Sequence, residues 1–355
     1  MPLGRLQTQI TFLGSSGGPV EASNCAVLVK PAALTYSQVL QIPRTPLVLV
    51  DAGAGLLLLA ELVADDVRSP ARLLLLYSDS APVDRYMKVV RTHPFRDLPG
   101  APISVLNAIL AKVGAVLISH PHLDHVLAAV LNLPAMDGAA PCGVYGSAFT
   151  MHALQTHLFN GVVWPDMVHA GVLQLNAVEP LYEMRICGDT YAVVRFPLSH
   201  GRTCSSETYE SLAFLLTCTD SGAKILIFGD FEADSVLRLA HNHAVWRHVA
   251  PFVLDGSLRC VVLECSMPNA APETNLYGHF TPRHLIEELA VLAANVSEHE
   301  KMPLRDLHVV VTHVKENIRG SDPRRTIQNE LEELNCQAGL GARFTMALSG
   351  VSFVV

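Results

Sequence analysis

The sequence feature that most constrains this chain is the stretch Ser119-His120-Pro121-His122-Leu123-Asp124-His125, which holds three histidines and an aspartate within six positions. His120 and His122 are two residues apart, so both imidazoles can converge on one metal ion from an extended turn. Asp124 and His125 follow directly and can face a second ion as a helix begins. Imidazole nitrogen and carboxylate oxygen together form a ligand set that zinc, iron and manganese accept. The stretch therefore predicts a metal site with room for two ions.

The segments on either side of this stretch favour that interpretation. The apolar run Val113–Ile118 before it is typical of a buried strand, and the run Val126–Leu131 after it is typical of a helix that packs on a core. A turn between a strand and a helix presents its side chains at the strand end, where binding sites are common. The alternative is a run of polar surface residues at the start of a helix, and it leaves this combination of flanks unexplained.

Three more ligand-type residues stand just past apolar runs later in the chain. They are His200, Asp230 and His313, and the preceding runs are Tyr191–Phe196 continued by Pro197-Leu198-Ser199, Lys224–Phe228 and Leu307–Thr312. Side chains at the same ends of neighbouring strands converge in space. A histidine in such a place is by itself more often structural. Together with the metal-type cluster, the three strand ends predict one shared site.

The pattern His-x-His-x-Asp-His is the signature of the metallo-β-lactamase superfamily. With leucine before the aspartate it resembles, more narrowly, the class II cyclic-nucleotide phosphodiesterases, the fungal low-affinity cAMP type. The turn Leu13-Gly14-Ser15-Ser16-Gly17-Gly18-Pro19 resembles the opening of the same family, and the likeness spans nearly the whole chain from Ile10 onward. It departs at Ala128 and Leu133, on the helix after the cluster, where the family usually has small residues. The resemblance implies an α/β (α+β) fold, a four-layer αββα sandwich of metallo-β-lactamase type.

The resemblance also implies a ligand set. The first metal would be held by His120, His122 and His200, the second by Asp124, His125 and His313, and Asp230 would bridge them. The implied cofactors are two divalent ions, most readily Zn²⁺, with Mn²⁺ or Fe²⁺ as alternatives. Asp51, which ends the apolar run Leu47–Val50, is expected to brace the metal-binding turn without binding metal.

His279 is the other histidine with an expected role in the reaction. Its setting, Tyr277-Gly278-His279-Phe280-Thr281-Pro282, resembles the loop whose histidine protonates the leaving oxygen in the phosphodiesterase and tRNA-processing branches of the superfamily. The alternative is a loop histidine that caps the helix starting at Thr281. Glu264, which closes the apolar run Cys260–Glu264, is the candidate that would orient His279.

The activity implied by the resemblance is hydrolysis of 3′,5′-cyclic nucleotides to nucleoside 5′-monophosphates, in cAMP catabolism and signal transduction. A cyclic phosphodiester is an anion, so hydroxide attacks it slowly in water. Two metal ions would neutralise that charge and supply a metal-bound hydroxide at neutral pH. His279 would protonate the leaving 3′-oxygen. The substrate is expected to be cAMP, with cGMP as a second candidate, and the sequence leaves the preferred base open.

Three other functions compete with this one. An RNA-processing nuclease of the same superfamily uses nearly the same residues, but the net charge of −8 and the absence of a basic arm argue against a long nucleic acid as partner. A thioester or lactam hydrolase does not need a proton donor such as His279. A non-catalytic scaffold usually loses ligands, and here the whole set is present. A small-molecule cyclic nucleotide is therefore the expected partner.

Composition sets the remaining expectations. The 355 residues are 50% hydrophobic, and no linker or repeat divides them, which predicts one domain over 1–355 with a helical or loop insertion around 55–102. No apolar run reaches the ~18 residues of a membrane span, and Met1–Gln9 lacks the apolar core of a signal peptide. Eight scattered cysteines predict reduced thiols. These features indicate a cytoplasmic protein without a membrane partner and leave a homo-oligomer open.

The rest of the chain gives simpler expectations. Ile10–Leu13 with Cys25–Val29, and Leu212–Thr217 with Lys224–Phe228, are predicted hairpins. A helix is predicted over Ala148–Phe159, and its histidines, His152 and His157, are expected at the surface. His241 and His243 have ligand-type spacing but would point apart on a helix, so we expect no site there.

Overall fold

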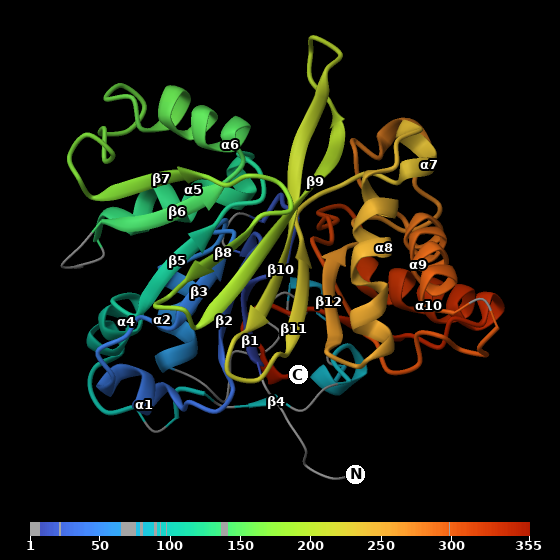
Figure 1. Cartoon of the computed structure of the whole chain (residues 1–355), viewed down its shortest axis with the longest axis horizontal. Helices are drawn as coiled ribbons and strands as arrows, with labels where there is room; N and C mark the ends of the chain where they lie inside the picture. Colours follow the sequence, from blue (N-terminus) through green and yellow to red (C-terminus); the bar gives the residue numbers. More distant parts are fainter. Residues whose placement is uncertain are drawn as a thin grey trace.

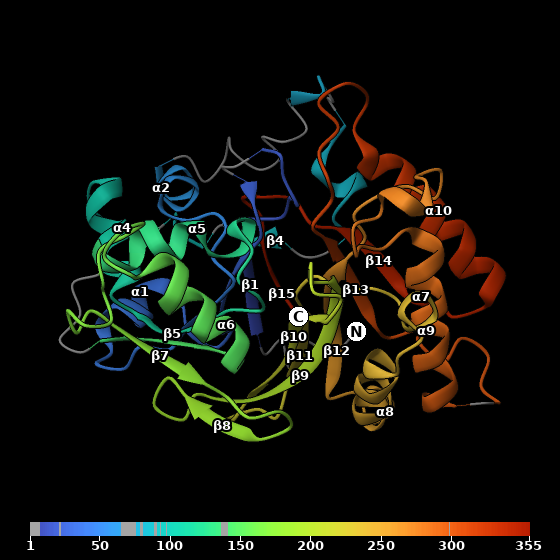
Figure 2. The same ribbon diagram turned by 90° about the horizontal axis from the view of Figure 1, so that it is seen from above.

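In the computed structural model, the described residues are 8–20, 23–64, 76–78, 81–88, 91–92, 94–96, 98–135, 141–297 and 299–355. Two mixed β-sheets lie face to face in the middle of the molecule, and helices cover the outer face of each (Figures 1 and 2). This arrangement is the predicted four-layer αββα sandwich.

The first sheet has eight strands in the order β4-β15-β1-β2-β3-β5-β6-β7. Their bounds are β1 Thr8–Gly14, β2 Ala26–Pro31, β3 Leu47–Val50, β4 Arg91–Thr92, β5 Val113–Leu117, β6 Cys142–Gly146, β7 Leu173–Ala177 and β15 Ser352–Val354. β1 and β2 pair antiparallel, as the opening hairpin predicts. From β3 to β7 the strands run parallel, so the ends of β3 and β5 point to the same edge.

The second sheet has seven strands in the order β14-β13-β12-β11-β10-β9-β8. Their bounds are β8 Glu183–Ile186, β9 Tyr191–Arg202, β10 Thr208–Cys218, β11 Lys224–Phe228, β12 Leu258–Glu264, β13 His308–Thr312 and β14 Arg343–Met346. β10 and β11 form the predicted antiparallel hairpin, and β11 to β14 are parallel. The carboxyl ends of β11, β12 and β13 therefore lie along one edge.

One strand is longer than its apolar run predicts. The expected strand Tyr191–Phe196 extends to Arg202, because β10 supplies pairing partners as far as Thr208. His200 consequently lies within β9 rather than beyond its end. The hairpin of β9 and β10 stands out above both sheets in Figure 1.

The helices form the two outer layers. On the first sheet lie α1 Tyr36–Gln41, α2 Leu56–Ala64, α4 Pro102–Leu110, α5 Leu123–Asn132 and α6 Ala148–Ala153, and on the second lie α7 Asp234–Leu237, α8 His241–Leu254, α9 Pro282–Val296 and α10 Pro323–Ala338 (Figure 2). Short 3₁₀ turns occur at Val83–Arg85, Leu133–Ala135 and Glu273–Asn275. The helix predicted over Ala148–Phe159 is α6 followed by a π-helical turn, Leu154–Leu158. None of the described helices is long and apolar enough to cross a membrane.

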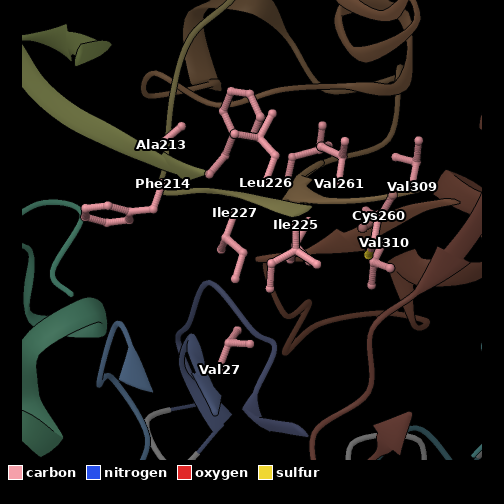
Figure 3. Packing of buried hydrophobic residues seen from close by; sticks show 14 of the residues in the cluster. Val27, Ala213, Phe214, Ile225, Leu226, Ile227, Cys260, Val261, Val309 and Val310 are labelled. Carbon is pink, nitrogen blue, oxygen red and sulfur yellow. The ribbon is translucent and has the colours of Figure 1, made fainter. Parts of the chain in front are cut away.

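The main core lies between the sheets and continues under the helices of the second sheet. Figure 3 shows Ile225 and Ile227 pointing toward Val27 of the first sheet, while Leu226 points the opposite way. Strands covered on both faces are apolar throughout, which is why the strands that lead to the site are unbroken apolar runs in the sequence.

The described residues of the predicted insertion, 55–102, join this core. Leu59 of α2 is buried under the first sheet, and Tyr86 and Met87 are buried among the residues between the sheets. β4 adds an edge strand next to β15. The apolar run predicted at Leu73–Leu76 falls outside the described residues, except Leu76.

Candidate metal centre

The seven predicted ligands meet where β5, β9, β11 and β13 come together. β5 leads into His120 and His122, the first residues of α5 carry Asp124 and His125, β9 carries His200, and Asp230 and His313 follow β11 and β13. The ligand atoms of His120, His122, His200 and Asp230 all lie within 4.8 Å of one another, as do those of Asp124, His125, Asp230 and His313. The structure thus brings together the same two sets that the sequence predicts, with Asp230 in both.

The carboxylate of Asp230 is the centre of this arrangement. Its Oδ2 lies 3.0 Å from His313 Nε2, 3.3 Å from His125 Nε2, 3.7 Å from His120 Nε2 and 3.9 Å from His200 Nε2. Burial by itself would raise the pKa of Asp230, but the imidazoles of His313 and His125 outweigh it and hold that pKa well below its usual range. Asp230 is therefore an ionised carboxylate between two groups of nitrogens.

Asp51 holds the metal-binding turn. Its Oδ2 accepts a hydrogen bond from Ser119 Oγ and lies 2.8 Å from His125 Nδ1, while its Oδ1 accepts from the Ser119 backbone N–H at 2.8 Å. Ser119 Oγ in turn lies 2.9 Å from His120 Nδ1. These contacts are those expected of a residue that braces the turn, and they point Nε2 of both histidines toward the centre.

The lone histidines are oriented from outside the centre in the same way. His200 Nδ1 lies 2.9 Å from the carbonyl oxygen of Gly278, and His313 Nδ1 lies 3.1 Å from Ser266 Oγ. Each of these histidines therefore presents Nε2 to Asp230. Burial lowers the pKa of His200 to about 4, so its imidazole is neutral, which is the form that binds metal.

His122 is held differently. Its Nδ1 faces His120 Nε2 at 3.1 Å, and its Nε2 has no hydrogen-bond partner among the described residues. Instead its ring stacks on Tyr209, with centroids 4.6 Å apart and planes 27° apart. Phe149 also contacts Tyr209 in a T-shaped arrangement, with ring centroids 5.1 Å apart. Sequence reasoning missed Tyr209, because an aromatic residue in a strand usually indicates packing rather than a site.

The donor groups fit divalent metal ions. His125 Nε2 is buried and has no hydrogen-bond partner in the described part of the chain, although it lies 3.3 Å from Asp230 Oδ2. His120 Nε2 and His122 Nδ1 face each other within 3.1 Å, and burial holds the pKa of His120 well below its usual value. Burial also lowers the pKa of His122, so the imidazoles of His120 and His122 are both neutral, which is the form that binds a metal cation. The first set has three imidazoles and the second has two imidazoles and the Asp124 carboxylate, and both share the Asp230 carboxylate. These are ligands that zinc, manganese and iron accept.

His279 lies beside both sets but is oriented by another residue. Its Nδ1 is 3.0 and 3.1 Å from the two carboxylate oxygens of Glu264, and its ring centroid is 4.8 Å from that of His200 and 5.0 Å from that of His313. Glu264 also accepts hydrogen bonds from the Phe231 N–H and Ser266 Oγ, so its oxygens are occupied. His200, Asp230, Glu264 and His279 also form a close group, but these contacts make Glu264 an orienting group rather than a free ligand.

The start of α9 separates the two interpretations of His279. The N-cap of α9 is Thr281, and its capping box is completed by His284, not by His279. His279 therefore does not make the capping contact that the structural alternative assigns to it.

Comparison with known proteins identifies the family. The sequence profile of the family described as "cAMP phosphodiesterases class-II" matches residues 86–350. The chain is 34% identical to a 3′,5′-cyclic-nucleotide phosphodiesterase of Candida albicans, over 98% of this chain and 99% of the relative. This chain belongs to the class II cAMP phosphodiesterases. A 3′,5′-cyclic-nucleotide phosphodiesterase of Schizosaccharomyces pombe is 27% identical, over 95% and 90% of the two chains.

Two solved structures share the fold of this phosphodiesterase. The crystal structure of unliganded yeast PDE1 matches with a TM-score of 0.87 and 26% identity, over 99% of this chain and 100% of that one. The metallo-β-lactamase fold protein YhfI of Bacillus subtilis matches with a TM-score of 0.51 and 14% identity, over 98% and 99%. The predicted fold and family are thus both confirmed.

The glycine turn of this phosphodiesterase packs directly on the centre. A Cβ at Gly17 would lie 2.5 Å from the His313 ring, so only glycine allows this approach. The carbonyl oxygen of Gly17 accepts a 2.6 Å hydrogen bond from Lys315 Nζ, which lies 3.9 Å from Asp124 Oδ2. Sequence reasoning interpreted the turn correctly as tight, but it missed Lys315.

The histidines outside the ligand pattern remain outside the centre. His152 and His157 are exposed, as predicted. His241 Nδ1 contacts Ser199 Oγ at 2.8 Å, and His243 is exposed. Neither pair belongs to any of the metal-type groups found among the described residues.

Proposed function

We propose that this chain hydrolyses 3′,5′-cyclic nucleotides, cAMP and as a second candidate cGMP, to nucleoside 5′-monophosphates. The observation that carries the proposal is the pair of ligand sets that share Asp230, with His279 beside both of them and engaged by Glu264. Membership of the class II family supports the substrate class. A site of this composition suits attack on an anionic ester better than it suits recognition of a long polyanion.

The metal sites we propose follow the two sets. His120, His122 and His200 would hold one ion, Asp124, His125 and His313 the other, and Asp230 would be shared. Two bound divalent ions, Zn²⁺ before Mn²⁺ or Fe²⁺, would neutralise the charge of the phosphodiester and lower the pKa of the attacking water.

His279 is the proposed proton donor. Glu264 accepts the Nδ1–H of its ring, so in the protonated imidazole Nε2 carries the proton that can be transferred. As the bond between phosphorus and the 3′-oxygen breaks, that proton passes to the oxygen and leaves a 3′-hydroxyl and a neutral imidazole. Glu264 is fixed in turn by the Phe231 N–H, 2.9 Å from its Oε1, so the ring keeps its orientation through the reaction.

Product analysis tests the proposal. The purified chain, loaded with Zn²⁺, is incubated separately with cAMP, cGMP, a short RNA and an acyl-thioester. We expect the cyclic nucleotides alone to be converted, with the 5′-monophosphate as product. Cleavage of the RNA or the thioester with the cyclic nucleotides left intact would overturn the proposal.

We also propose that residues 1–355 act as one domain in the cytoplasm. Each ligand set draws residues from both sheets, so neither sheet makes a site alone.

Each of the eight cysteines is free, which suits a reducing compartment. Titration of denatured protein with a thiol reagent, without reductant, should detect all of them, and disulfides in protein purified under non-oxidising conditions would contradict the proposed location. Sedimentation of the purified chain would determine whether it forms a homo-oligomer.

A further inference from the structure

We propose that Lys315 binds the phosphoryl group of the substrate and favours the doubly charged phosphate of the product, an inference that rests on the proposed function. Among the described residues, Lys315 is the lysine or arginine whose charged group comes within 4.0 Å of a predicted metal ligand. No sequence pattern singles it out, and the proton donation and metal binding derived above do not use it.

The ammonium group of Lys315 has donors to spare. It carries three N–H bonds, and one of them is used by the carbonyl oxygen of Gly17 at 2.6 Å. The distance of 3.9 Å to Asp124 Oδ2 is an ion pair without a hydrogen bond. The side chain is 32% exposed, so it is partly open to solvent next to the centre. Two donors are therefore available to a phosphoryl oxygen.

The backbone that carries Lys315 is fixed at each residue. The hydrogen bonds are His313 N to Ser15 O at 2.8 Å, Gly17 N to Val314 O at 3.0 Å, Lys315 N to Ser266 O at 3.0 Å, and Glu316 N to Gly18 O at 2.8 Å. Glu316 also pairs with Arg324, which is fully buried. A lysine on a fixed backbone, with its ammonium tied to a carbonyl oxygen, loses less conformational freedom when it binds a ligand than a free surface lysine does.

Electrostatics explains why a cation at this position points to an anionic ligand. The carboxylate of Asp124 attracts Lys315 only while its own charge is uncompensated. A divalent ion held by Asp124 would reverse that attraction, because two cations a few ångströms apart repel each other. An anion between them removes the repulsion. Hydrolysis converts a phosphodiester with one negative charge into a monophosphate with two, so the contact strengthens along the reaction.

A purely structural role is the alternative. Lys315 ties the glycine turn to the segment after β13, and its loss could simply loosen His313. The two roles predict different results: a structural tether affects metal content and thermal stability, whereas a phosphate contact affects the affinity for phosphate-bearing ligands and leaves the metals in place.

The experiment compares Lys315→Met, Lys315→Arg and Lys224→Met with the unchanged chain. Methionine keeps most of the aliphatic stem and removes the charge, and arginine restores a charge. Lys224 is the matched control, because its Nζ also donates to a glycine carbonyl, that of Gly222 at 3.2 Å, but at the far end of the strand that leads to Asp230. The measurements are kcat and KM for cAMP, calorimetric affinity for adenosine 5′-monophosphate, metal content and melting temperature.

We expect Lys315→Met to lower kcat/KM and the affinity for adenosine 5′-monophosphate by roughly 10–100-fold each, the size of a hydrogen bond to a charged group. Metal content, melting temperature and the weak binding of uncharged adenosine should not change. Lys315→Arg should recover part of the loss, and Lys224→Met should match the unchanged chain. Equal affinity for the monophosphate in Lys315→Met and the unchanged chain, or a loss that follows metal loss, would overturn the proposal.

The failure of this inference can be told from failure of the proposed function. If the unchanged chain hydrolyses cAMP and Lys315→Met behaves like it, only the role of Lys315 is wrong. If the unchanged chain does not hydrolyse cyclic nucleotides, the proposed function is wrong. The role of Lys315 can then still be judged from the affinity of the zinc-loaded protein for inorganic phosphate, which should fall in Lys315→Met.

Discussion

The two halves of the metal centre share Asp230 but are held in different ways. In the second half, His125 is engaged by the carboxylate of Asp51 and His313 by Ser266. In the first half, His120 is engaged by Ser119 and His200 by the Gly278 carbonyl oxygen, but neither partner is a carboxylate. The ring of His122 stacks on Tyr209. A hydrogen bond to a carboxylate fixes an imidazole and also increases its basicity, whereas a stacked ring limits tilt alone. The first half should therefore be the weaker of the two metal sites.

The residues that border the two halves also differ. Tyr209 and Phe149 give the first half an aromatic border, while Lys315 gives the second half a cationic one. A cyclic nucleotide has an apolar aromatic end and an anionic end. The two borders therefore differ in the same way as the two ends of the proposed substrate.

The largest effect is expected for Asp230, the residue that both halves share. Asp230→Ala removes the shared carboxylate and should reduce bound metal from about two ions per chain to close to none, with hydrolysis of cAMP at background level. Elemental analysis and a rate assay measure this. Asp230→Asn keeps the shape without the charge and should behave almost as badly. An active Asp230→Ala protein without bound transition metal would contradict the proposed site.

His279 offers the next test, because it contacts both halves without belonging to either. His279→Ala should retain both metals and slow cAMP hydrolysis by roughly 10²–10⁴-fold. A nitrophenyl phosphodiester should be hydrolysed at a nearly normal rate, since nitrophenolate leaves without a proton.

His313→Ala is the matched variant for that test and should slow both substrates together, because it removes a ligand. Equal losses on both substrates for His279→Ala, with metal depleted, would mean that the roles of His279 and His313 are exchanged.

The comparison itself is tested by removing what holds each half. Loss of an orienting partner typically weakens metal binding by about 10–100-fold. For Asp51→Ala the loss of metal affinity should be at the upper end of this range. It should be larger for the half that contains His125, which Asp51 contacts directly, than for the half that contains His120, which Asp51 reaches through Ser119. For Tyr209→Leu the loss of metal affinity should be at the lower end of this range and should affect the first half only. Stepwise Co²⁺ titration, followed by visible absorption, resolves the two sites.

Tyr209→Phe serves as the control for the stacked contact, since it keeps the ring that packs on His122. It should bind Co²⁺ like the unchanged chain. A first-site affinity as low in Tyr209→Phe as in Tyr209→Leu would show that the phenol, not the stacking, holds His122.

The smallest effect concerns the fold around both halves. His308, on β13, is buried, and burial followed by the Arg343 charge lowers its pKa to about 4. Its unfolded pKa is about 6.5, so the folded chain resists protonation of His308. Its contribution to stability is present above about pH 6.5 and is lost as the pH falls toward 4, by about 3 kcal/mol at most.

Denaturant unfolding at several pH values tests this expectation. His308→Gln removes the titrating group, and its amide is long enough to pair with Thr345, which lies 2.7 Å from His308 Nε2. The stability of this variant should fall less steeply between pH 6.5 and 4. Identical slopes for variant and unchanged chain would assign the acid sensitivity to the centre instead.

The convergence of the candidate ligands could be predicted because most of its signals are local, whereas the assignment of ligands to two ions came from the family resemblance. Four ligands lie within the stretch 120–125, and Asp230 and His313 follow apolar runs that leave no doubt about where a strand ends. Tyr209 and Lys315 could not be predicted in the same way. The position of Tyr209 depends on how β10 pairs with β9, and that of Lys315 on a contact with Gly17, 298 residues away in the sequence.

Two short strands and the end of a third were not predicted, for related reasons. β4 has two residues and β8 has four with charged members, so neither gives a periodic pattern, and both exist through pairing with a longer strand. The full length of β9 was missed because its later residues include Pro197 and Gly201, which argue against a strand unless a partner such as β10 is known.

The hydrogen bond from the His313 N–H to the carbonyl oxygen of Ser15 has a consequence for biosynthesis. The ligands of the first half lie between His120 and Asp230, so all of them are translated well before His313. His313 and Lys315 are translated later, so the Ser15 carbonyl oxygen can make its contact with the His313 N–H only then. A chain that stops before His313 would therefore lack the last ligand of the second half and also the backbone donor to the Ser15 carbonyl oxygen.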